Sequence, residues 1–166
     1  FNWVWMVFLA VGVGAILAAR KYLVTHSRWL TQTAAMFTST AVAGVLVHVL
    51  VKTEDPKQVV WSLLIAFTLG GLAAQLLHPR VNPIGAIASP MLLAILGYGH
   101  VLIHGDSTET VAAMWYAGNL PGAALPLPIH YASAGVAGVC LGVGWAHGFL
   151  RRPADSGLDD DAVAET

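Results

Sequence analysis

The stretch Pro90–His104, PMLLAILGYGHVLIH, decides how the rest of the chain is interpreted. It is an apolar run without acidic, lysine or arginine residues, and it carries a proline, two glycines and two histidines four residues apart. A helix turns about 100° and rises about 1.5 Å per residue, so His100 and His104 lie one above the other on one face. The stretch is typical of the outer half of a membrane-spanning helix that carries a pair of imidazoles.

Composition places the whole chain among multi-spanning membrane proteins. Of its 166 residues 57% are hydrophobic and only 10% are charged, and the mean hydropathy is +0.69. Soluble domains are about 45–50% apolar and about 25% charged, so this chain lacks the polar surface that a soluble domain needs. The formal net charge of −1 argues against nucleic-acid binding, which requires a basic patch. With Cys140 as the single cysteine, no intrachain disulfide can form.

Five apolar runs are long enough to cross a bilayer, which takes about 20 residues. The expected spans are residues 2–19, 29–51, 59–77, 84–103 and 129–150. The first has tryptophans at one end and Arg20-Lys21 at the other, which is how the two membrane interfaces are marked. The sequence therefore predicts an all-α integral membrane protein, built as one bundle of five transmembrane helices.

Small residues and one proline predict the shape of this bundle. Stripes of small residues let helix backbones approach closely in lipid, where the hydrophobic effect does not drive helix association. The residues expected to make such contacts are Gly70 in the third span and Ala134, Gly138 and Gly142 in the fifth. Pro90 removes one helical hydrogen bond and clashes one turn back, which predicts a kink near Ala86.

The connector of about 24 residues after the fourth span has two parts, and a polar tail ends the chain. Asp106 and Glu109 resemble a helix N-cap pattern, so the following VAAMWY is expected to form a short interfacial helix. The return segment NLPGAALPLP is too rich in proline and glycine for a regular helix. Residues 151–166 are polar and acidic and are expected to be disordered.

The distribution of lysine and arginine predicts the orientation. With five spans, two lysines fall on one side of the membrane (Lys52 and Lys57), and six basic residues fall on the other (Arg20, Lys21, Arg28, Arg80, Arg151, Arg152). The positive-inside rule then places the N-terminus outside and the C-terminal tail in the cytoplasm. We expect a bacterial cytoplasmic (inner) membrane as the location.

Four histidines reach the outer ends of three helices in this topology: His48, His100, His104 and His130. Imidazole is a ligand for haem iron, copper and zinc. A haem b would use His48 with His100 or with His130, whereas copper or zinc would use His100, His104 and His130, with Asp106 as a further ligand. The alternative is that these residues are interfacial or packing side chains, since histidine is amphipathic.

Two classes of function stay open. All nine acidic residues lie in connectors or the tail, which argues against an ion-coupled transporter of small solutes, because such carriers keep ionisable groups inside the membrane. We favour a non-catalytic membrane subunit or scaffold whose small-residue faces pack against other membrane subunits or a second copy within the lipid bilayer. The alternative is a redox or metal-binding membrane protein with its site at the outer histidines.

Overall fold

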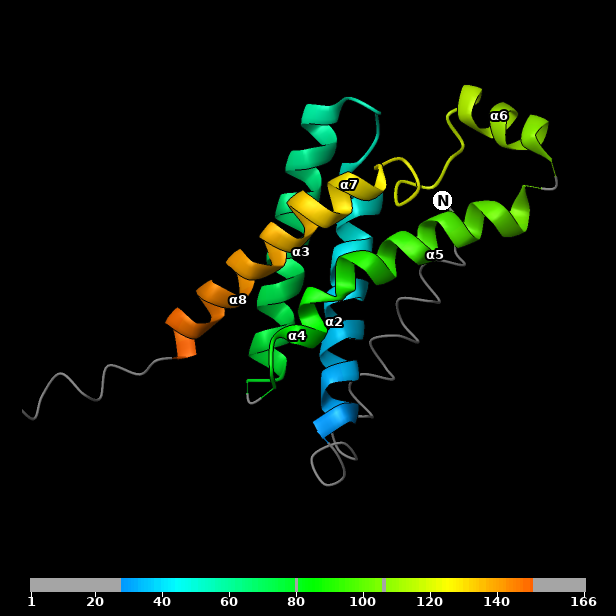
Figure 1. Ribbon diagram of the computed structural model, residues 1–166. Coiled ribbons are helices and arrows are strands. Elements are labelled where there is room, and N and C mark those ends of the chain that lie inside the picture. Colours follow the sequence, from blue (N-terminus) through cyan, green and yellow to red (C-terminus); the bar gives the residue numbers. More distant parts are fainter. Residues whose placement is uncertain (1–27, 80, 106, 151–166) are drawn as a thin grey trace, which may run out of the picture.

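The computed structural model describes residues 28–79, 81–105 and 107–150, and these form helices and connecting loops with no strand (Figure 1). Within these described ranges, four helical segments are long and apolar enough to cross a membrane. They are α2 (Arg28–Leu50), α3 (Pro56–Leu77), the pair α4 (Ile84–Ile87) and α5 (Ser89–His104), and a segment made of α7 (Pro128–His130), the π-helical turn η1 (Tyr131–Gly135) and α8 (Val136–Leu150).

The all-helical class is confirmed for the described residues. Each of the four segments begins and ends within three residues of its expected span, and these expected spans are 29–51, 59–77, 84–103 and 129–150. The agreement is close because apolar runs of membrane-spanning length are bounded by charged or proline-containing turns. The predicted first span, 2–19, and the tail, 151–166, lie outside the described residues. The total of five spans and the orientation of the chain stay predictions.

Helix α3 is the centre of the bundle and packs against α2 on one side and α8 on the other (Figure 1). Of the 18 consecutive residues that form the apolar part of α3, 56% are buried, compared with 33% of the corresponding residues of α2. Two glycines make the contacts close. A Cβ at Gly70 would lie 2.8 Å from the Ser39 carbonyl oxygen, and one at Gly138 would lie 2.6 Å from the Leu64 carbonyl oxygen. The backbones touch directly, which maximises van der Waals contact where lipid removes the hydrophobic drive.

Pro90 lies beside the interruption between α4 and α5. Helix α4 ends at Ile87, Ala88 forms a turn, and α5 restarts at Ser89, so the break falls two residues after the expected position at Ala86. Pro90 occupies the first turn of α5, where its missing N–H would have had no helical partner. The proline is also buried against η1, because a Cβ at Gly135 would lie 2.9 Å from the Pro90 Cβ.

Two hydrogen bonds between buried side chains connect the helices. The hydroxyls of Ser39 on α2 and Ser89 on α5 lie 2.8 Å apart, and the Thr38 hydroxyl lies 3.4 Å from Nε2 of His78 at the end of α3. Such bonds contribute about 0.6 kcal/mol each in membrane helices, with about 1.7 kcal/mol as the maximum. His78, which follows the end of α3, is therefore a packing residue of the bundle.

The short helix expected in the long connector is present as α6 (Thr108–Tyr116). Its N-cap is Ser107 and not Asp106, which lies outside the described residues. Ser107 has an extended backbone, and its hydroxyl accepts a hydrogen bond of 3.2 Å from the backbone N–H of Thr110. A serine in this position satisfies one of the N–H groups that a helix start leaves without a partner. The pattern of Asp106 and Glu109 predicted the helix but not which residue caps it.

Candidate functional site

One side of the bundle holds the C-terminal ends of α2 and α5, the N-terminal end of α7 and the short helix α6 (Figure 1). The four histidines singled out from the sequence belong to these elements. His48 is exposed in the last turn of α2, His100 and His104 are in the last two turns of α5, and His130 ends α7. This end of the bundle also holds the α2–α3 turn and the connector between α6 and α7 (Figure 1).

The structure brings His100 and His104 into direct contact. Their rings are stacked with centroids 4.2 Å apart and planes 29° from parallel. The Nδ1 atom of His104 lies 2.9 Å from the His100 carbonyl oxygen. A carbonyl oxygen can only accept a hydrogen bond, so Nδ1 of His104 carries a proton, and in the neutral ring Nε2 presents its lone pair. This is the arrangement of a metal-binding histidine, whose second nitrogen donates to a backbone carbonyl.

His130 has a different role. Its Nδ1 accepts a hydrogen bond of 3.2 Å from the backbone N–H of Leu127, the residue that caps α7. In the neutral ring the proton then lies on Nε2, so neither nitrogen presents a free lone pair while this bond persists. The His130 imidazole thus provides a hydrogen-bond acceptor at the start of the segment made of α7, η1 and α8. The sequence shows that Pro128 follows Leu127, but the hydrogen bond between Leu127 and His130 depends on how the connector turns into α7.

The copper or zinc set expected from the sequence is not assembled in the part of the chain that the structure describes. No group of three histidine, cysteine or acidic side chains there is placed to hold a metal ion. Asp106 lies outside the described residues. The haem pairings of His48 with His100 or with His130 stay predictions, although a pairing through His130 would require breaking its bond to Leu127.

Two tyrosines that the sequence analysis did not single out hold the proline-rich return segment. Tyr131, 2% exposed, donates its hydroxyl hydrogen to the Ala123 carbonyl oxygen at 2.7 Å, and Tyr98 donates to the Pro126 carbonyl oxygen. The Tyr131 ring meets the rings of Phe67 and Tyr98 edge to face, with centroids 6.2 and 6.5 Å away. A segment with few helical hydrogen bonds needs other donors for its carbonyl groups, and the tyrosines supply them.

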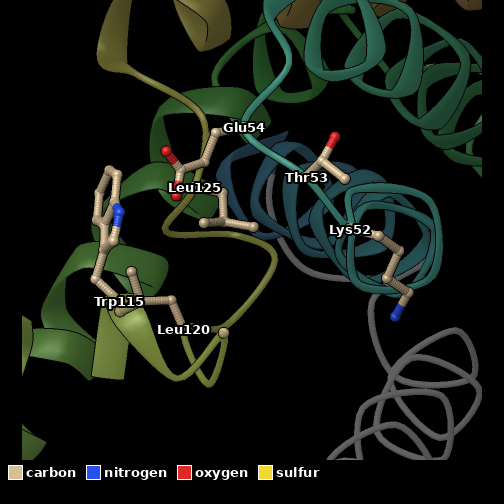
Figure 2. Close-up of a pocket in the computed structure, with 7 residues that line it drawn as sticks. Lys52, Thr53, Glu54, Trp115, Leu120 and Leu125 are labelled. Atoms are coloured by element: carbon tan, nitrogen blue, oxygen red, sulfur yellow. The ribbon is translucent and has the colours of Figure 1, made fainter. Parts of the chain in front are cut away.

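A cavity of about 280 Å³ opens between the α2–α3 turn and the connector after α6 (Figure 2). Its lining residues are Lys52, Thr53, Glu54, Trp115, Gly118, Leu120 and Leu125. The Glu54 carboxylate and the Trp115 ring lie on the same side of the cavity, and the Lys52 side chain points away from them (Figure 2). Sequence reasoning missed this cavity, because its two walls are separated by about sixty residues of chain.

An open groove runs along the end of α8, on the side of the helix that α3 does not cover. It has a volume of about 530 Å³ and is lined by Gly144, Trp145, Gly148 and Phe149. Nothing described lies within 4 Å of a Cβ built at Gly144 or Gly148. The two aromatic side chains are exposed. The groove therefore has a glycine floor with an aromatic ridge along one side of it.

Comparison of the chain with protein-family models, with curated proteins and with solved structures finds no match, so what this chain does has to be inferred from its own residues.

Proposed function

We propose that the chain is a non-catalytic membrane subunit that associates with a second copy of itself through the groove on α8. The observation that carries the proposal is the contrast between two glycine pairs of one helix. Gly138 and Gly142 pack against α3, whereas no described residue lies within 4 Å of a Cβ built at Gly144 or Gly148. A GxxxG pair with an open face is the packing motif of membrane helix dimers.

Symmetry supports a second copy as the occupant of this groove. Two copies in the same bilayer orientation bring their α8 helices together in parallel, and a two-fold contact uses the same patch on both chains. The glycine floor of one helix then receives the ridge of the other. We further propose an N-terminus outside, a cytoplasmic tail and a bacterial inner membrane, supported by the lysine and arginine distribution.

Cys140 provides a direct test, because it is exposed and lies one turn before Gly144 on the same side of α8. Mild oxidation of membranes should yield a disulfide-linked dimer of the unmodified chain. Gly148→Leu should lower the association constant of the dimer by about tenfold, which corresponds to a loss of about 1.4 kcal/mol of association free energy. The control is Ala112→Leu, at an exposed position of α6 away from the groove, which should leave the dimer unchanged. A chain that stays monomeric in the bilayer, or equal dimer fractions in both variants, would contradict the proposal.

A second candidate function is metal or haem binding, which the His100–His104 pair favours. Two imidazoles one turn apart offer a partial ligand set, and the bond to the His100 carbonyl oxygen holds the His104 ring in place. The remaining ligands would come from residues such as His48 or from a second chain.

Elemental analysis and an absorption spectrum of the purified protein test this candidate. Bound copper or zinc, or the Soret band of a haem, is expected in the unmodified chain and should disappear in His104→Ala. His147→Ala is the control, because His147 lies in the last turn of α8 and not on α5 with the histidine pair. Colourless, metal-free protein, or an unchanged metal content in His104→Ala, would exclude the pair as a site.

A further inference from the structure

The cavity between the α2–α3 turn and the α6–α7 connector lies where a membrane surface is expected. Helix α2 ends at Leu50 and α3 begins at Pro56, so the five residues between them follow directly on the ends of two membrane-crossing helices. Helix α6 on the facing side has no buried residue and exposes Trp115 and Tyr116. Aromatic side chains of this kind gather at the level of the lipid headgroups.

The turn that forms one wall of the cavity is held by its own hydrogen bonds. The Thr53 hydroxyl donates to the Gln58 side-chain oxygen, and Nε2 of Gln58 donates to the Leu50 carbonyl oxygen at 3.1 Å. Asp55 caps α3 by accepting a bond of 3.2 Å from the Lys57 N–H. The Glu54 backbone is thus fixed between two anchored residues, which limits the conformational entropy lost when a ligand binds.

The chemistry of the cavity suits a cation. Glu54 supplies a carboxylate and Trp115 an indole ring on the same side, while Leu120 and Leu125 supply apolar surface (Figure 2). The Lys52 ammonium donates to the His48 carbonyl oxygen at 2.9 Å and points away from that side, so it does not neutralise the Glu54 carboxylate. A carboxylate beside an indole face is a favourable site for an alkylammonium group.

We propose that this cavity binds an organic ammonium group of the kind found in phosphatidylethanolamine headgroups and in free ethanolamine compounds. The ammonium lies between the Glu54 carboxylate and the Trp115 ring, and the attached carbons lie against Leu120 and Leu125. A volume of about 280 Å³ accommodates a headgroup of this size but leaves no room for a folded peptide. The inference goes beyond the proposed dimer, since it uses no residue of the α8 groove.

The test compares two sources of the same group in bilayer discs that carry the full chain. In the first arm the discs contain equal phosphatidylethanolamine and phosphatidylglycerol, and mass spectrometry identifies the lipids that stay bound after gentle extraction. We expect enrichment of phosphatidylethanolamine in the unmodified chain. In the second arm the discs contain phosphatidylglycerol alone, and O-phosphoethanolamine is titrated by calorimetry. Binding in the second arm without enrichment in the first identifies a soluble amine as the ligand and also supports the proposal.

The variants Glu54→Gln and Trp115→Leu should each reduce the enrichment or the affinity by about tenfold, while the thermal midpoint stays unchanged because both side chains are exposed. The matched controls are Glu109→Gln on α6 and Trp61→Leu on α3, which are exposed residues outside the cavity and should behave as the unmodified chain. Equal retention of both lipids together with no binding of O-phosphoethanolamine would overturn the proposal. So would unchanged binding in Glu54→Gln.

Discussion

Replacing Gly142 by alanine is expected to lower the free energy of unfolding by about 1–3 kcal/mol, the usual cost of forcing a methyl group into a filled interface. A Cβ at this position would overlap the Thr68 carbonyl oxygen and would lie 2.7 Å from the Leu72 nitrogen. Both are backbone atoms of α3, so no side chain can move aside, and α8 has to shift away from the central helix. The measurement is the free energy of unfolding in mixed detergent micelles, obtained by denaturant titration.

Gly99→Ala on α5 is the matched control, because it introduces the same methyl group into another helix and outside the α8 groove. Nothing described lies within 4 Å of a Cβ at Gly99, so we expect a change within about 0.5 kcal/mol. Equal destabilisation by the two substitutions would contradict this explanation, because alanine has the higher helix propensity and only the contact between α3 and α8 distinguishes the two sites.

Tyr131→Phe is expected to destabilise the fold by about 1–3 kcal/mol, because it removes the hydroxyl that bonds the Ala123 carbonyl oxygen at 2.7 Å. The ring stays in contact with Phe67 and Tyr98, so the change isolates the hydrogen bond. The readout beyond stability is amide hydrogen exchange in the return segment, which should accelerate for the Ala124 amide and its neighbours.

The control for this prediction is Tyr116→Phe, since Tyr116 is 89% exposed at the end of α6 and its hydroxyl faces the surroundings. Unchanged exchange in the return segment of Tyr131→Phe would mean that other contacts, such as the packing of Gly97 against Ala123, are sufficient to hold it. A Cβ at Gly97 would lie 2.5 Å from the Ala123 carbonyl oxygen, so this second contact is close.

The candidate sites could be predicted from the sequence only where their residues are neighbours along one helix. The contact of His100 with His104 follows from a spacing of four, and the structure shows the two rings stacked. The expectation that His130 would join them depended on how two distant helix ends meet. In the structure its Nδ1 instead bonds the Leu127 N–H, three residues away, because a local donor at a helix start was available.

The two glycine pairs of α8 illustrate the same limit. Gly138 with Gly142 and Gly144 with Gly148 have identical spacing, so the pattern cannot distinguish them. The rotation of α8 about its axis and its oblique crossing of α3 place the first pair against the α3 backbone and leave the second pair uncovered by any described residue (Figure 1). Both quantities result from packing all the helices together.

Composition and spacing along the chain were enough to predict helices of membrane-spanning length, the turns between them and an interruption near Pro90, because each depends on consecutive residues and on the thickness of a bilayer. The tertiary structure alone decided that Tyr131 reaches Ala123, that Ser39 meets Ser89, and that Glu54 and Trp115 border one cavity. These residues are brought together by helix rotations and crossing angles, which are set by the fit of many side chains at once and leave no periodic signal in the sequence.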